Sequence, residues 1–252
     1  MKKSIALIFT CTLLPWPGAA QDTVRKYNDR DTIRKSEFHY KKLILPSILI
    51  GYGVIGLESD QLKTWNLNLR DEVKEDIDER ITIDDFSQWA PALSVYALNN
   101  IGVAGKHNLR DRSMILATSY LLMSATVLSL KTTTRIERPD GSSRNSFPSG
   151  HTATAFAGAE FLWQEYKDQS IWYGVAGYAV ATGTGIFRIY NNRHWLTDVA
   201  AGAGIGILST KAAYWMYPWL HRTLFRNETK STSMLAPSYD GSHIGVSFLR
   251  RF

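Results

Sequence analysis

The chain contains very little cysteine. Cys11 is the only one among 252 residues, so no disulfide can form within the chain and no cysteine-ligated metal is expected. Cys11 also lies inside an apolar leader segment. Thr10 precedes it, where a lipoprotein signal would carry a small apolar residue, Gly or Ala. The remainder of the chain therefore offers no thiol nucleophile.

Other signals are missing as well. The sequence shows no internal repeat, no low-complexity tract and no alternation of strands with helices. Its formal net charge is +6, but the basic residues are dispersed and no nucleic-acid-binding motif is present, so we expect no nucleic-acid partner. No convincing Asp, Glu and His ligand cluster is found, so we expect no metal and no cofactor. The modest positive excess is compatible with acidic lipids or phosphorylated substrates.

The first twenty residues have the pattern of a secretory signal peptide. Lys2 and Lys3 precede an apolar run from Ile5 to Leu14, and small residues follow up to Ala20. The run is shorter than the roughly 20 residues of a membrane span. We expect a signal peptide over residues 1–20, cleaved after Ala20, with an uncleaved anchor as the alternative. Either form predicts export to the cell envelope. Residues 21–42 are a polar lead-in.

Six apolar segments make up most of the remaining chain. They are rich in Ala, Leu, Ile and Gly, lack strict alternation and exceed strand length, which favours helices. The segments are 43–57, 89–104, 113–130, 151–166, 171–189 and 195–217. We therefore predict an all-α fold, with a helical domain over residues 43–220.

Two further segments have a periodic pattern. In the charged stretch from Glu58 to Gln88, large apolar residues recur every three or four positions, which predicts an amphipathic helix. These residues are Leu62, Trp65, Leu69, Val73 and Ile77. Packing on the bundle is favoured over binding flat on a membrane. In the tail, residues 221–252, apolar residues alternate from Ile244 to Phe248, which predicts a short strand or hairpin.

Three clusters of charged and histidine residues lie between positions 131 and 198. They are Lys131-x6-Arg138-Pro139, Pro148-Ser149-Gly150-His151 and Arg188-x5-His194-x3-Asp198. Together they supply three cations, two imidazoles, one carboxylate and a glycine-containing turn. This combination suits a site that binds a phosphate-like anion and breaks a P–O bond through a histidine nucleophile.

The third cluster contains the candidate nucleophile. His194 and Asp198 are four residues apart at a helix start, so they share a face. The carboxylate can fix one imidazole nitrogen and leave the other free to attack phosphorus. For this cluster alone, a structural His–Asp pair that caps the helix is an equally good interpretation.

The other two clusters suit phosphate binding. Ser149 is a good N-cap, Gly150 permits close approach of a ligand, and His151 could protonate a leaving alkoxide. Ordinary helix capping would explain that cluster by itself. Lys131 and Arg138, with Arg188, would balance the negative charge of a five-coordinate transition state.

In this order and spacing, the three clusters resemble those of the type 2 phosphatidic acid phosphatase (PAP2) superfamily, which includes bacterial acid phosphatases and vanadium haloperoxidases. The resemblance covers about residues 89–217 and implies a six-helix bundle of the PAP2/haloperoxidase type. It implies that His194 forms a phosphohistidine, that Asp198 orients it, and that His151 is the general acid. It further implies that phosphate is bound by Lys131, Arg138, Ser149, Gly150 and Arg188, without a metal. One departure is Phe187, where a small residue commonly precedes the arginine.

The predicted function is a metal-independent phosphatase that hydrolyses phosphate or pyrophosphate esters, with a lipid-linked substrate favoured. The alternatives are a secreted acid phosphatase on small soluble phosphomonoesters, a vanadium-dependent haloperoxidase, and a non-catalytic anion-binding envelope protein. We expect membrane association.

Two arguments predict on which side of the membrane the motifs lie, and they disagree. The positive-inside rule places the end of the bundle opposite the motifs in the cytoplasm, and the motifs in the periplasm. The basic residues at that end are Lys106, His107, Arg110 and Arg112 in one loop, and His221, Arg222 and Arg226 after the last helix. Six crossings after a cleaved signal would place the motifs in the cytoplasm instead. The periplasmic prediction holds if the first segment does not cross, or if no segment does. Integral and peripheral association both stay open.

Overall fold

A computed structural model describes residues 40–75, 82–224, 233–239 and 244–250. The predicted signal peptide and nearly all of the polar lead-in lie outside these residues. The helices are α2 (Lys41–Glu58), α3 (Asp60–Glu75), α4 (Ile83–Ser87), α5 (Ala90–Asn100), α6 (Leu109–Thr134), α7 (Gly150–Tyr166), α8 (Ile171–Tyr190) and α9 (Leu196–Leu224). The strands are β1 (Ser233–Tyr239) and β2 (Ile244–Arg250).

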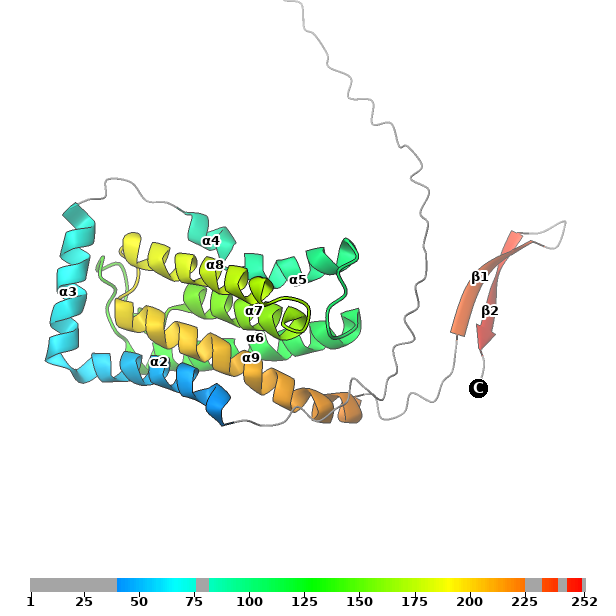
Figure 1. Ribbon diagram of the computed structural model, residues 1–252, viewed down its shortest axis with the longest axis horizontal. Coiled ribbons are helices and arrows are strands. Elements are labelled where there is room, and N and C mark those ends of the chain that lie inside the picture. The colour runs from blue at the N-terminus through cyan, green and yellow to red at the C-terminus, as the bar shows by residue number, and fades with distance from the viewer. Residues whose placement is uncertain (1–39, 76–81, 225–232, 240–243, 251–252) are drawn as a thin grey trace, which may run out of the picture.

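The predicted helical architecture is confirmed. Helices α2 and α5 to α9 correspond to the six apolar segments, and they pack into one bundle (Figure 1). The predicted C-terminal hairpin is also present, because β1 and β2 pair antiparallel with Ser233 opposite Arg250.

Helix α7 is the centre of the bundle. It packs against α5, α6, α8 and α9, and its alanines from Ala153 to Ala159 are fully buried. Small residues on α9 let the two backbones approach closely. A Cβ at Gly202 would lie 2.5 Å from the Ser149 carbonyl oxygen, and one at Gly206 would overlap the Ala153 carbonyl. The close contact between the backbones of α7 and α9, here called the seam between these helices, therefore requires glycine.

This seam gives a stability prediction. Gly206→Ala is expected to destabilise the protein by about 1–3 kcal/mol, because the added methyl group meets backbone rather than a movable side chain. Gly183→Ala is the matched control on α8, where a Cβ meets nothing within 4 Å. That change should be neutral or stabilise by up to about 1 kcal/mol, as alanine favours helix. Thermal unfolding of both variants checks the difference, and equal melting temperatures would contradict it.

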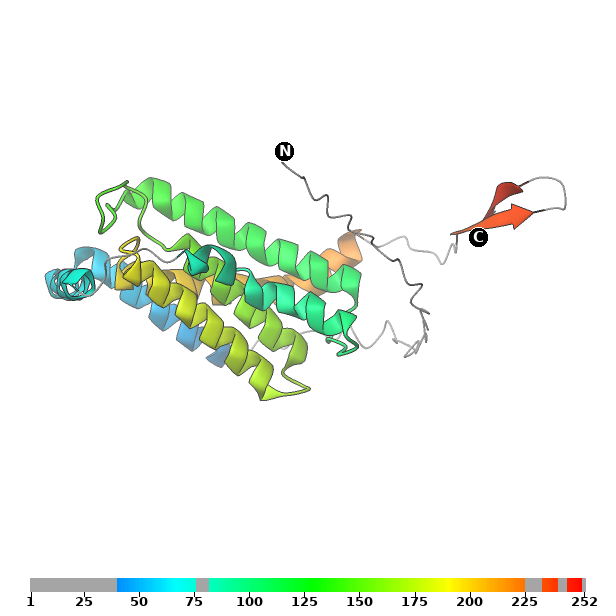
Figure 2. The same ribbon diagram turned by 90° about the horizontal axis from the view of Figure 1, so that it is seen from above.

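The motif-bearing helix ends meet at one end of the bundle. Figures 1 and 2 show the end of α8 and the start of α9 there, with α3 crossing the same end. The predicted amphipathic helix is confirmed for α3, whereas Ile77 lies outside the described residues. Helix α3 contacts α2 and α8, and Asn66 Nδ2 donates to Thr197 Oγ1 on α9 at 3.0 Å. Trp65 is 59% exposed, so the bundle covers only part of the apolar face of α3.

One described helix, α6, is long and apolar enough to cross a membrane. Helices α2 and α3 pass the same test only as a pair, with a 94° bend between them. Several helices also present large apolar side chains to the outside. Examples are Ile48, Ile55, Leu121, Leu128, Trp172 and Ile186.

Two residues counted in the charge argument are not surface charges. His107 and Arg112 are 4% and 3% exposed. Arg112 donates to the His107 carbonyl at 2.7 Å and to Asn99 Oδ1 at 2.8 Å, and His107 Nδ1 lies 2.7 Å from Glu165 Oε1. These residues hold the helix ends together, so the basic residues of this loop available to a membrane surface are fewer than the sequence suggested.

Candidate functional site

A polar cavity of about 300 Å³ lies among the motif-bearing helix ends. It brings together one residue from each sequence cluster, namely Arg138, His151 and Arg188. The rest of its lining comes from residues outside the motif pattern. These are Thr82, Asp84, Asp85, Asn191 and Arg193. Three guanidinium groups around one small cavity make it suited to an anion.

The candidate nucleophile pair is buried next to this cavity, where Arg193 of the lining directly precedes His194. His194 and Asp198 are 2% and 1% exposed. His194 Nδ1 lies 3.6 Å from Asp198 Oδ2, which is longer than a hydrogen bond. The Ser146 hydroxyl lies between them, 3.4 Å from Nδ1, and donates to Asp198 Oδ2 at 2.5 Å. Ser146 therefore contacts both members of the pair.

Backbone contacts fix the position of His194. Its N–H donates to the Arg188 carbonyl at 3.3 Å, which ties the loop between α8 and α9 to the end of α8. We call this loop, residues 191–195, the nucleophile loop after the predicted role of His194. The Trp195 N–H donates to Asp198 Oδ2 at 2.9 Å, so the same carboxylate caps the start of α9. Both interpretations of the His–Asp pair thus describe this structure: the carboxylate caps a helix and also faces the imidazole.

The pKa values of His194 and His151 are both lowered, which disfavours the charged imidazole. Burial lowers the pKa of His194 to about 4, against the opposing effect of Asp198. Burial also lowers the pKa of His151, and Arg188 adds to this effect while Asp85 opposes it. His194 is therefore neutral over most of the pH range, as a nucleophile must be.

The three predicted phosphate-binding cations are held by different partners. Arg188 is 7% exposed, and its guanidinium donates to the buried carboxylate of Asp84. Arg138 Nε donates to Asn145 Oδ1 at 2.9 Å, and burial followed by Arg188 lowers the pKa of Arg138. Lys131 does not line the cavity. Its ammonium donates to the carbonyl of Asn145 at 2.5 Å, so in this structure it holds the loop after α6.

Ser149 and Gly150 begin α7, as predicted. Ser149 Oγ accepts from the Thr152 N–H at 3.5 Å, and the Ser149 N–H donates to the Asp198 carbonyl at 3.0 Å. Ser149 is fully buried and neither residue lines the polar cavity. The capping interpretation is thus confirmed, while phosphate binding by these two residues stays a prediction.

Asp84, Asp85 and His151 offer atoms within 4.8 Å of one another, close enough to hold a metal ion. Each already has a partner, however. Asp84 accepts from Arg188 and from Asn191 Nδ2, and Asp85 Oδ1 lies 2.9 Å from His151 Nε2. Ion pairs and hydrogen bonds therefore account for this group.

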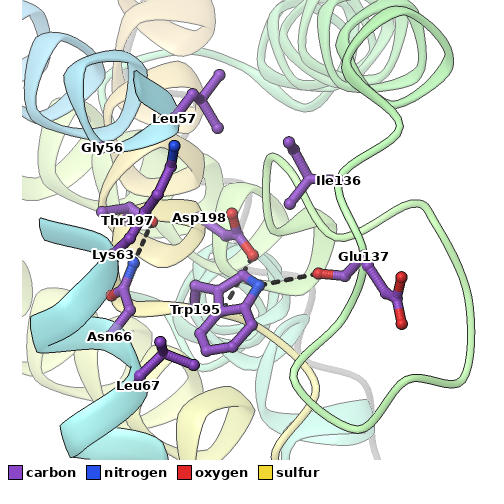
Figure 3. Close-up of a pocket in the computed structure, with 10 residues that line it drawn as sticks. All are labelled: Gly56, Leu57, Lys63, Asn66, Leu67, Ile136, Glu137, Trp195, Thr197 and Asp198. Carbon is purple, nitrogen blue, oxygen red and sulfur yellow. Dashed lines mark hydrogen bonds between the residues drawn. The ribbon is translucent and has the colours of Figure 1, made fainter. Parts of the chain in front are cut away.

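A second cavity, of about 310 Å³, is lined by other residues, among them Trp195 and Asp198 (Figure 3). It is mostly apolar, with walls from α2, α3, α9 and the loop before Arg138. Its lining consists of Gly56, Leu57, Lys63, Asn66, Leu67, Ile136, Glu137, Trp195, Thr197 and Asp198. The Trp195 indole N–H donates to the Glu137 carbonyl at 2.9 Å, which joins the nucleophile loop to the loop after α6.

Comparison with known proteins identifies the family. The model of the PAP2 superfamily matches residues 112–222, which contain all the predicted site residues. A lipid A 1-phosphatase of Porphyromonas gingivalis is 40% identical over 161 residues, 64% of this chain and 35% of that protein. The bacitracin transport permease protein BcrC of Bacillus licheniformis is 34% identical over 102 residues, 39% of this chain and 48% of that protein. The chain thus spans about a third to a half of these curated relatives.

Two solved structures were also matched. The Aquifex aeolicus LpxE structure is 24% identical, with a TM-score of 0.45 over 59% of this chain and 94% of that one. A transmembrane PAP2 type phosphatidylglycerolphosphate phosphatase from Bacillus subtilis is 16% identical, with a TM-score of 0.46 over 76% and 99%. The family model thus assigns residues 112–222, the segment that contains the three motifs, to the PAP2 superfamily.

Proposed function

We propose that this protein is a metal-independent phosphatase of the bacterial envelope that hydrolyses phosphate or pyrophosphate esters of lipids. The observation that carries the proposal is the polar cavity, where Arg138, Arg188 and His151 converge next to the buried His194–Asp198 pair. A site that only bound anions would need the cations, but not two histidines with a carboxylate behind one of them.

The chemistry follows from these positions. A phosphoryl group held by Arg138 and Arg188 is attacked by the free nitrogen of His194, which forms a P–N bond as the ester P–O bond breaks. His151 transfers a proton to the departing oxygen. Water then attacks the phosphohistidine with His151 as base, releasing inorganic phosphate and restoring both histidines. Asp198, together with Ser146, keeps the reacting imidazole oriented.

Three observations support a lipid-linked substrate. The first is the similarity to a P. gingivalis protein that is a lipid A 1-phosphatase. The second is the apolar cavity, whose walls include Asp198 and the residues directly before Arg138. The third is the exposed apolar side chains on α2, α6 and α8. A membrane-associated enzyme with its motifs towards the periplasm fits these features.

A substrate panel tests the proposal. Phosphate release is measured from lipid A 1-phosphate, a polyprenyl pyrophosphate, phosphatidic acid and a soluble hexose phosphate, with and without EDTA. We expect turnover of at least one lipid phosphate, unchanged by EDTA and blocked by vanadate, which mimics the five-coordinate phosphoryl group. Strict dependence on added magnesium or zinc would refute the mechanism. A preference for the hexose phosphate would favour the soluble acid phosphatase, and bromide oxidation after vanadate loading would indicate a haloperoxidase.

The histidine pKa values predict an acidic optimum. Activity needs neutral His194 and protonated His151, so kcat/KM should be bell-shaped, with an acid limb near pH 4 and a basic limb below the ordinary value of 6.5. In the His151→Gln protein the basic limb should disappear. Because the unfolded chain protonates His194 before the folded one does, folding stability should also fall as pH drops from 6.5 to about 4. A wild-type optimum above pH 8 would contradict this assignment.

A further inference from the structure

Helix α4 extends two adjacent carboxylates into the polar cavity. Asp84 is 1% exposed and binds Arg188 and Asn191, which anchors α4 to the end of α8. Asp85 is the outer of the two and its side chain is 54% exposed. Its Oδ1 atom lies 2.9 Å from His151 Nε2 and 4.0 Å from the Arg188 guanidinium.

The backbone of α4 is held firmly enough to fix Asp85. Ser87 Oγ lies 2.8 Å from Thr184 Oγ1 on α8. Gln88 Nε2 donates to the Asp85 carbonyl at 2.9 Å. With the buried anchor of Asp84, these bonds place the Asp85 carboxylate at the mouth of the cavity, beside the imidazole of the candidate general acid.

The charges around His151 explain why such a partner matters. Arg188 faces it from α8, and Arg138 and Arg193 line the same cavity. These cations disfavour a positive imidazole, as burial does. Asp85 and Asp84 are the carboxylates that oppose them. The hydrogen bond to Asp85 is the larger of these opposing effects on the pKa of His151.

We propose that Asp85 is a positioning residue that orients His151 and keeps it protonated for transfer to the leaving-group oxygen. The proposal rests on the phosphatase function proposed above. The Nε2–H bond goes to Asp85, so the Nδ1 proton moves to the ester oxygen as the P–O bond breaks, and a neutral imidazole remains bound to the carboxylate. This is the role that a triad aspartate has toward its histidine.

Asp85 lies outside the segment that the family model matches, residues 112–222. The proposed arrangement therefore concerns this chain's own α4 and adds a residue to those of the three motifs. The alternative role is competition, in which the carboxylate occupies the place of the substrate phosphate. Loss of the carboxylate lowers turnover of the alkyl phosphate in the first role, and lowers KM with unchanged or raised kcat in the second.

The experiment compares two leaving groups in Asp85→Asn. The phenolate of p-nitrophenyl phosphate leaves without a proton, whereas a long-chain alkyl phosphate needs one. We expect kcat/KM, which reports only the steps up to departure of the leaving group, to fall by about 10-fold or more for the alkyl phosphate and to change less than about 3-fold for p-nitrophenyl phosphate. The basic limb of the pH profile should move to lower pH, and Asp85→Glu should restore both properties. Asp71→Asn is the matched control, an exposed ion-paired carboxylate on α3 whose side chain is 59% exposed.

A second measurement does not depend on activity. Titration of the nitrogen-15-labelled histidines by NMR should show a lower pKa for His151 in Asp85→Asn than in the wild type, with His221 unchanged. An unshifted His151, or equal losses on both substrates, would overturn the proposal. A lower KM with unchanged or raised kcat would also overturn it, in favour of the competing carboxylate. If the wild type hydrolyses neither of these substrates and none of the lipid phosphates of the panel, the phosphatase function fails, and the titration still decides whether Asp85 holds His151.

Discussion

The His194→Ala protein is expected to lose phosphate release by at least roughly 10³-fold, because removal of a nucleophile eliminates the covalent pathway. The side chain is 2% exposed, so the exchange removes an imidazole from a position that water does not readily fill. Single-turnover and steady-state assays on the best substrate of the panel measure the loss. His221→Ala is the control, a histidine near the opposite end of α9 that lies 3.8 Å from Asp111.

The covalent intermediate gives this prediction a direct readout. Brief incubation with phosphorus-32-labelled substrate, followed by quenching, should leave acid-labile label on the wild type and on His151→Gln, but not on His194→Ala. Asp198→Asn should label slowly, since the imidazole stays in place but loses the acceptor that orients it. Label that persists in His194→Ala would assign the nucleophile to another residue.

Asp84→Asn is expected to destabilise the protein by about 3 kcal/mol, because it leaves the buried Arg188 guanidinium without its main counter-charge. Asp85, 4.0 Å away and half-exposed, compensates only in part. Thermal or denaturant unfolding in a fixed detergent measures the change. Activity should fall as well, because Arg188 loses the contact that fixes its guanidinium.

A double-mutant cycle separates the contribution of the Asp84–Arg188 ion pair from general destabilisation. Arg188→Gln alone should also be costly, since it leaves the Asp84 carboxylate buried against Asn191 alone. The loss of unfolding free energy in the protein with both substitutions should be smaller than the sum of the two single losses, as expected for residues in direct contact. Additive losses would show that the pair contributes no coupling energy, and that α4 is held by its other contacts.

The helices were predictable because their signal is local. Length, apolar composition and the absence of alternation are properties of consecutive residues, and α2 and α5 to α9 fall where those properties indicated. Capping was also readable, since Ser149 before Gly150 is a local pattern, and the structure has the predicted N-cap there.

The partners of the motif residues were not predictable in the same way. Asp84 and Asp85 lie in a charged stretch whose period indicates a surface helix, and only the fold brings them against Arg188 and His151. Ser146 precedes the second motif by two residues and shows no pattern of its own, yet it lies between His194 and Asp198. Contacts between residues so far apart in the sequence depend on tertiary packing.

Tertiary packing also explains why some charged residues have contacts that their residue types do not indicate. Lys131 has the residue type of a phosphate ligand, and its ammonium donates to carbonyls of the loop that follows α6, so phosphate binding by Lys131 stays a prediction. His107 and Arg112 have the composition of surface charges, but Glu165 and Asn99 bury them in a network between helices. Residue type predicts what a side chain can bind, whereas burial determines what it does bind.

The seam between α7 and α9 has a consequence for how the site responds to a substrate. Gly202 lets the α9 backbone contact the Ser149 carbonyl, and the Ser149 N–H donates to the Asp198 carbonyl. His151 on α7 and His194 before α9, the predicted general acid and nucleophile, are thus joined by direct backbone contacts between their helices, and we expect them to move as one block. Their relative geometry is set when the protein folds, so reorganisation on substrate binding should fall on α4 and the loop after α6. Differences in specificity among homologues are then expected to arise from those two segments, around an invariant reaction geometry.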